Sequence, residues 1–145
     1  MMREILFRGK RLNNGEWVYG FYCHVPRGRL DRDEHLIQTV KKSGKMGMLH
    51  CVDPSTVGQY TGLKDKNGKR IFEGDVVRCG TGRICKVTFF ISPGFSGFDL
   101  VPVVGFYAPP PNEWLLFADT EIIGNIHDNP ELLEGGALNG FCCGV

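Results

Sequence analysis

Hydrophobic and polar residues alternate with a period of two along much of the chain, which is the pattern of half-buried β-strands. The clearest example is residues 16–25, EWVYGFYCHV, which follow a turn signal at Asn13-Asn14-Gly15. Four side chains share one face of this predicted strand: Trp17, Tyr19, Phe21 and Cys23. The pattern predicts an N-terminal β-hairpin, and the absence of a long 3.6-residue apolar period predicts little helix.

The central stretch, residues 57–78, reads VGQYTGLKDKNGKRIFEGDVVR and predicts a strand, a polar turn, a short apolar segment, a corner and a second strand. Asn67-Gly68 favours a tight turn because both residues adopt left-handed backbone angles at low cost. Glu73-Gly74-Asp75 predicts the corner. The expected core anchors of this stretch are Tyr60, Leu63, Ile71 and Phe72.

The second half continues the same pattern. Further strands are predicted at 83–91, 97–107, 113–118 and 121–126, with an extended loop at 109–111 and a short helical turn after Asn129-Pro130. Five strands in roughly seventy residues are typical of a small closed barrel. We therefore expect an all-β protein in which residues 1–56 form an N-terminal β region, 57–134 a small barrel and 135–145 a flexible tail.

Charge is distributed unevenly, although the net charge of the 145 residues is only +1. Residues 1–78 contain 15 Lys and Arg against 9 Asp and Glu, whereas residues 79–145 contain 2 against 7. A basic half favours contact with phosphates, and halves of opposite sign also favour contact between two copies of the chain. Solvated basic loops explain the same distribution equally well.

Three features predict a cytoplasmic protein without a membrane segment. No apolar run reaches the roughly 20 residues that a membrane-spanning helix needs. The first ten residues, MMREILFRGK, carry charges where a signal peptide has its apolar core. The six cysteines are expected to be reduced, because a chain of this length and apolar content does not need disulfides to fold.

Two pairs of soft metal ligands occur in the first half, Cys23-His24 and His50-Cys51. Neither pair belongs to a C-x-x-C or H-x-x-x-H spacing. Adjacent residues on a strand point to opposite faces, so each pair can give only one ligand to a site. We expect structural roles for these residues and no cofactor, with a zinc site as the alternative.

Glycine-rich turns and paired polar residues do not define a catalytic centre. Gly80-Thr81-Gly82 lacks the third glycine and the following helix of a dinucleotide-binding loop, and the glycines before Lys69 are one residue too far apart for a phosphate loop. Glu73, Asp75 and His127-Asp128 lie at predicted turns, where such side chains usually bond to the backbone. We therefore expect no enzymatic activity.

Three segments in order, MREILFRGKRLNNGEWVYG, VGQYTGLKDKNGKRIFEGDVVR and EIIGNIHDNPELL, resemble the YopX family of small phage and prophage proteins. The resemblance implies a C-terminal barrel of the SH3-like kind, at 57–134, preceded by an N-terminal β region. It also implies a gene carried by a bacteriophage or an integrated prophage. It implies no activity, and the cysteines and the glycine-rich tail depart from the family pattern.

The sequence supports two functional hypotheses. The first is a non-catalytic binding or assembly module that contacts a phage or host protein, or a second copy of itself as a homo-oligomer. The second is binding of nucleic acid through the basic half, since aromatic side chains beside Arg and Lys can stack on bases. Seven residues are the expected phosphate contacts and two the stacking platform: Arg8, Lys10, Arg11, Lys64, Lys66, Lys69 and Arg70, with Trp17 and Tyr19. Core packing is the simpler interpretation of the aromatic residues.

Overall fold

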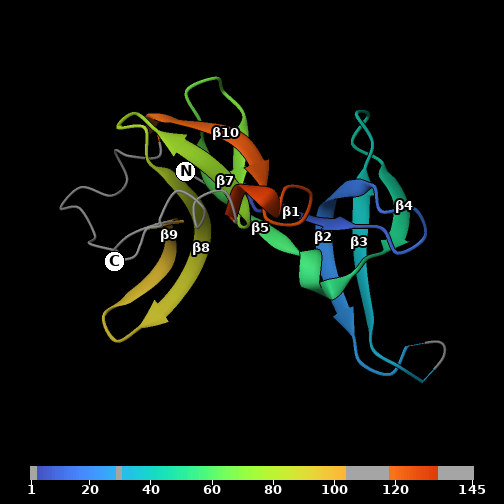
Figure 1. The fold of residues 1–145 in the computed structure, drawn as a ribbon. Coiled ribbons are helices and arrows are strands. Elements are labelled where there is room, and N and C mark those ends of the chain that lie inside the picture. The colour runs from blue at the N-terminus through green and yellow to red at the C-terminus, as the bar shows by residue number, and fades with distance from the viewer. Residues whose placement is uncertain (1–2, 29–30, 104–117, 134–145) are drawn as a thin grey trace. The chain divides into compact units, whose positions relative to one another are not determined.

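The computed structural model describes residues 3–28, 31–103 and 118–133, and nearly all of its regular elements are β-strands (Figure 1). This confirms the all-β class. The chain divides into two compact units, Met1–Tyr60 and Thr61–Val145. The loop expected at 109–111, the tail at 135–145 and all but the last residue of the strand at 113–118 lie outside the described residues.

The first unit is built on a sheet of antiparallel strands in the order β4-β3-β2-β1-β5. Its members are β1 (Phe7–Lys10), β2 (Trp17–Val25), β3 (Glu34–Val40), β4 (Met46–Cys51) and the start of β5 (Gly58–Lys64). β1 and β2 are the predicted N-terminal hairpin, with Gly15 at a φ of 71° in its turn. A short 3-10 helix, η1 (Pro54–Thr56), is capped by Asp53, whose carboxylate accepts a hydrogen bond from Ser55 N at 3.0 Å.

Two glycines of this sheet, Gly20 and Gly9, face closely packed atoms. A Cβ added at Gly20 would collide with the carbonyl oxygen of Gln38 on β3. At Gly9 it would lie 3.2 Å from Cδ1 of Ile37 and 3.2 Å from Cγ2 of Val52. Ile37 and Val52 are almost completely buried. The core of the first unit therefore lies on the sheet face that carries Gly9 and Ile37.

The second unit contains the rest of β5, β6 (Arg70–Phe72), β7 (Asp75–Cys79), β8 (Ile84–Ser92), β9 (Phe95–Pro102) and β10 (Thr120–Asn125). Four of these strands form an antiparallel sheet in the order β10-β7-β8-β9. Its core cluster consists of six buried side chains: Ile71, Val77, Cys79, Cys85, Val87 and Leu100. Phe98 and Ile122 pack against this cluster.

This sheet does not close into the barrel that we expected for residues 57–134. Among the described residues, its outer strands β9 and β10 do not pair with each other. β7 pairs with β8 only over the segment 76–78, whereas β8 and β9 continue as a two-stranded hairpin as far as Ser92. Ile91, near the end of this hairpin, is 81% exposed. The residues that would have to curve to close a barrel instead form a projecting hairpin (Figure 1).

The central stretch has the predicted order of strand, turn, apolar segment, corner and strand. Three of its four expected core anchors, Tyr60, Ile71 and Phe72, are buried. The assignment of Leu63 to the core is wrong, because its side chain is 39% exposed. Leu63 lies three residues after Tyr60 on β5, and on a strand this spacing places the two side chains on opposite faces.

Asp65 ties the turn of the central stretch to β10. Its carboxylate accepts hydrogen bonds from the backbone N–H groups of Asn67 (2.9 Å), Lys69 (2.9 Å) and Ile122 (3.1 Å). Burial alone would raise the pKa of Asp65, but these hydrogen bonds together lower it below its ordinary value. The ionised carboxylate therefore stabilises the fold of the second unit.

We expect Ile71→Ala to lower the free energy of unfolding by roughly 2–5 kcal/mol, because it removes a fully buried side chain from the core of the second unit. Ile91→Ala is the matched control, since Ile91 belongs to the same unit but is exposed. Its expected effect is within about 0.5 kcal/mol. Urea unfolding of the intact protein measures both variants, and equally small losses would show that Ile71 is not part of a packed core.

We expect Asp65→Asn to destabilise the protein by about 1–3 kcal/mol at neutral pH, because the amide is a poorer acceptor for three backbone N–H groups. A lowered folded-state pKa contributes stability that is present above the unfolded pKa of about 3.9 and is lost as the pH falls through the folded pKa. The difference between the variant and the unmodified protein should therefore shrink below about pH 4.

The control for this pH series is Asp31→Asn, which changes an exposed carboxylate. Urea unfolding between neutral and acid pH measures the free energy of unfolding for all three proteins. If the loss in free energy of unfolding caused by Asp65→Asn stays constant with pH, the ionised carboxylate does not have the proposed role.

Candidate binding surface

One face of the first-unit sheet exposes apolar side chains on β2 and β4, whereas its β3 members are the buried Leu36 and the half-buried Gln38. Seven residues share this face according to the strand register and the alternation of side chains: Tyr19, Phe21, Cys23, Leu36, Gln38, Leu49 and Cys51. We call this surface the open face. Phe21 pairs with Gln38, which pairs with Leu49, and these three form its central row.

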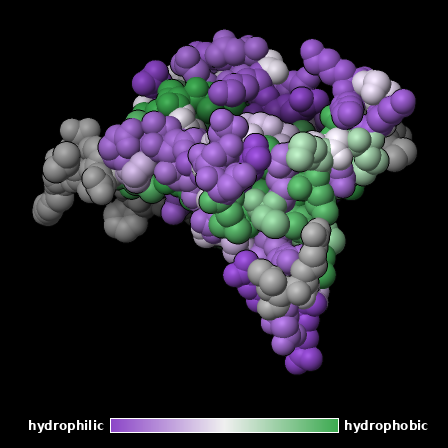
Figure 2. All heavy atoms as spheres, turned by 90° about the vertical axis from the view of Figure 1, so that its right-hand side faces the viewer, coloured by the Kyte–Doolittle hydropathy of each residue, from purple (hydrophilic) through white to green (hydrophobic). Residues whose placement is uncertain are grey.

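The open face exposes large apolar side chains. Phe21 is 54% exposed, Leu49 47% and Tyr19 46%. Cys23 and Cys51 are exposed free thiols on the same face. Viewed from the side on which β4 lies, hydrophobic residues gather on the surface, with hydrophilic residues above and below them (Figure 2). The expectation that the aromatic residues of β2 pack in a core is therefore wrong for Tyr19 and Phe21.

The β1 end of this face is cationic. Arg8 pairs with Tyr19, and Lys10 pairs with Trp17. Arg8 Cζ lies 4.6 Å from the centroid of the Trp17 ring, and Lys10 Nζ lies 5.5 Å from it. At these distances the face of the ring attracts both cations. The structure thus brings together four of the nine residues that were predicted to contact nucleic acid: Arg8, Lys10, Trp17 and Tyr19. The prediction of a phosphate contact is wrong for Arg8, because this residue is only 6% exposed.

The other five of these residues lie elsewhere. Arg11 forms an ion pair with Glu16, with a separation of 3.9 Å. The remaining four are exposed and surround the central turn of the second unit: Lys64, Lys66, Lys69 and Arg70. Lys66 lies 3.9 Å from Glu121 on β10. This basic turn belongs to a different unit from the aromatic platform.

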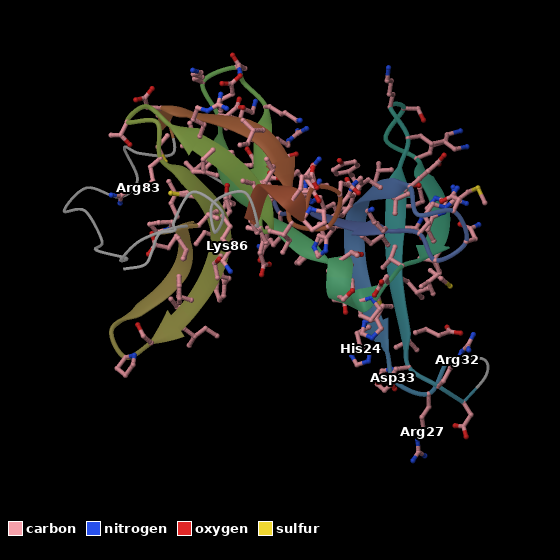
Figure 3. All side chains as sticks on the ribbon, in the orientation of Figure 1. His24, Arg27, Arg32, Asp33, Arg83 and Lys86 are labelled. Atoms are coloured by element: carbon pink, nitrogen blue, oxygen red, sulfur yellow. The ribbon has the colours of Figure 1, made fainter. Side chains whose placement is uncertain are left out.

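The opposite face of the β2–β3 pair carries a row of polar rings that the sequence analysis missed. The imidazoles of His24 and His35 are stacked, with centroids 4.5 Å apart and planes within 1°. Nδ1 of His35 lies 2.6 Å from the Tyr22 hydroxyl, and Nε2 of His24 lies 3.2 Å from Oδ2 of Asp33 (Figure 3). His24 and His35 are directly paired. A correct alignment of the two strands would have revealed this pair.

The proposed soft-ligand pairs are split between the two faces of the sheet. Cys23 and Cys51 belong to the open face, whereas His24 and His50 lie on the other face. In the ranges that the structure describes, no three His, Cys, Asp or Glu side chains come together so that they could hold a metal ion. None of the helices in those ranges has the length and apolar character needed to cross a bilayer.

The polar residues at the turns of the second unit bond to the backbone. Oδ2 of the buried Asp75 accepts a hydrogen bond from Phe72 N at 2.7 Å. The side-chain oxygen of Asn125 accepts hydrogen bonds from the N–H groups of His127 (3.0 Å) and Asp128 (2.9 Å). These contacts fix the corner before β7 and the turn after β10.

The fold and the open face define a small all-β protein of two units with an apolar sheet surface. A family model described as YopX protein matches residues 6–134, and the chain belongs to the YopX family. Among solved structures it is similar to the crystal structure of protein EF1440 from Enterococcus faecalis, with a TM-score of 0.54 and 22% sequence identity. That match covers 91% of this chain and 99% of the other, and it shows the fold. No match to a curated protein was found.

Proposed function

We propose that the protein is a non-catalytic binding module that associates with a second copy of itself through the open face. The observation that carries this proposal is the exposure of Tyr19, Phe21 and Leu49 on one face of the sheet, where Phe21 and Leu49 flank Gln38 in one cross-strand row. Aromatic and aliphatic side chains held on a rigid surface supply much of the binding energy at protein interfaces. Covering them removes apolar area from water, which favours association.

The distribution of charge favours a protein partner over a phosphate-bearing one. The central row of the open face and the row that contains Leu36 are uncharged. Cations lie at one end of β2, where Lys10 pairs with Trp17, and an anion lies at the other, where Glu34 pairs with Val25. A two-fold axis that lies in the plane of the interface and runs perpendicular to β2 would place Lys10 of one copy toward Glu34 of the other.

Family membership and the free cysteines support the bacterial cytoplasm as the proposed location of the protein. The chain belongs to the YopX family. Because its sequence resembles phage and prophage members of that family, we propose that it acts in the cytoplasm of a bacterial host. Four cysteines are free thiols: Cys23, Cys51, Cys79 and Cys85. Free thiols fit a reducing compartment. A phage or host protein is the alternative partner for the open face.

We expect Leu49→Arg to abolish self-association, because the interface would have to bury an unpaired charge. Met48→Arg is the matched control, since Met48 is the neighbouring exposed residue of β4 and points to the opposite face. Light scattering over a concentration series should give more than one chain mass for the unmodified protein and for Met48→Arg. It should give 16.2 kDa for Leu49→Arg.

An unmodified protein that stays at 16.2 kDa at high concentration would rule out self-association. The partner of the open face would then be a phage or host protein. Loss of association in both variants would show that the interface is not the open face.

Nucleic-acid binding is the second candidate function, and the exposed ring of Tyr19 next to the Lys10–Trp17 pair favours it. If bases stack on this end of the sheet, Tyr19→Ala should weaken binding of single-stranded DNA or RNA by roughly 1–3 kcal/mol, with Met48→Ala as the control. Affinity should also fall steeply with salt concentration, because phosphate contacts release counterions. Fluorescence anisotropy at low salt measures both effects, and a flat titration would exclude this function.

A further inference from the structure

Two thiols lie side by side in the core of the second unit. Sγ of Cys79 and Sγ of Cys85 are 3.7 Å apart, and both cysteines are free. Cys79 is the last residue of β7, and Cys85 lies on β8 opposite Val77. Because residues two apart on a strand share a face, Cys79, Val77 and Cys85 all point into the same buried cluster.

The two thiols differ in their surroundings. Cys79 is 9% exposed and adjoins the turn between β7 and β8, whereas Cys85 is 3% exposed. The hydrogen bond with Cys85 and the charge of Arg83 outweigh burial and the charge of Asp119, and they lower the pKa of Cys79. The same hydrogen bond and burial raise the pKa of Cys85. Arg83 lies at this turn (Figure 3). Cys79 thus has the properties of an attacking thiolate and Cys85 those of a resolving thiol.

We propose that Cys79 and Cys85 form a redox site, at which hydrogen peroxide oxidises the two thiols to a disulfide between β7 and β8. The limited exposure of Cys79 favours a small, uncharged oxidant over a bulky one. The site does not involve the open face, so it is independent of the proposed binding function.

The reaction proceeds in two balanced steps. The Cys79 thiolate attacks one peroxide oxygen, the O–O bond breaks and hydroxide leaves, which gives a sulfenic acid on Cys79. The Cys85 sulfur then attacks the Cys79 sulfur, and the S–OH bond breaks. The proton of the Cys85 thiol joins the departing hydroxide to form water. The hydroxide of the first step takes up the proton that the Cys79 thiol released on ionisation and becomes the second water. The two sulfur atoms together lose two electrons, and one peroxide is reduced to two waters.

The local backbone allows the two sulfur atoms to meet. They must approach from 3.7 Å to the roughly 2.05 Å of a disulfide bond. Cys79 lies beyond the last β7–β8 register pair, Arg78 with Ile84, and its backbone N–H bonds to Arg83 O across the turn. Gly82 in this turn has a φ of 88°. Cys79 also pairs with Thr120, the first residue of β10. Because Cys79 lies at the end of β7 in both pairings, it can shift with the glycine-containing turn while the rest of β7 stays in place.

The test uses the full chain with the other four cysteines replaced by serine: Cys23, Cys51, Cys142 and Cys143. After treatment with hydrogen peroxide, the protein is unfolded and alkylated with a maleimide. We expect a mass about 2 Da below that of the reduced chain, no alkylation, and a linked pair of peptides that contain Cys79 and Cys85. Reduction with dithiothreitol should restore two alkylation sites.

Two results would overturn the proposal. One is full alkylation of both Cys79 and Cys85 after a peroxide treatment that oxidises the amino acid cysteine, added to the same tube as a control. The other is sulfinic or sulfonic acid on Cys79 without a disulfide, because it would show that Cys85 does not resolve the sulfenic acid.

Single replacements test the assigned roles. In Cys85→Ser, dimedone should trap a sulfenic acid on Cys79, and in Cys79→Ser the remaining Cys85 should react at least about tenfold more slowly. Equal rates would contradict the assignment of Cys79 as the attacking thiolate. Circular dichroism checks that both variants fold. If either does not, the mass measurement on the chain that retains both cysteines decides the proposal.

Discussion

The alternation of side chains across a sheet, of which only one face holds the core, is the constraint on which the rest of this structure depends. In the first unit Ile37 is buried against the backbone at Gly9. Its neighbour Gln38 must then point to the other face, and the cross-strand partners of Gln38, Phe21 and Leu49, must point there with it. The open face is therefore a geometric consequence of where the core lies. Phe21 on β2 and Leu49 on β4 occupy outward-facing positions, so the open face carries large apolar side chains.

The sheet of the second unit also holds its core on one face, and buried polar groups hold the turns between its strands. Asp65 and Asp75 are buried, and each accepts hydrogen bonds from backbone N–H groups at a turn. Such groups are costly to bury unless they are bonded, so these carboxylates fix the turns that begin and end the short strand β6. The strand register, in turn, brings Cys79 and Cys85 together. One set of backbone alignments thus positions both the structural carboxylates and the thiol pair.

The sequence predicted local features well because they depend on residues that are close along the chain. The N-terminal hairpin, the turn at Asn67-Gly68 and the corner at Gly74 all follow from turn chemistry and a period of two. Periodicity also sorted the side chains of β2 into two faces, but it could not tell which face would be covered, and so it misjudged Phe21. The bond from Ile122 N to Asp65 spans 57 residues, and neither propensity nor spacing carries that information. The prediction of a closed barrel was wrong for a similar reason, because closure depends on pairing between strands that are distant in sequence.

The exposure of the open face is itself an argument for a partner. Soluble monomers rarely display contiguous apolar surface at the centre of a regular sheet, because it promotes unspecific association. Here the apolar rows lie between Lys10 at one end of β2 and Glu34, opposite Val25, at the other. Charges at the border of an apolar surface contribute more to orientation and to the exclusion of wrong partners than to affinity. In the proposed self-association, a second copy in the reversed orientation would bring Lys10 of each chain toward Glu34 of the other, and these two pairs would favour that orientation.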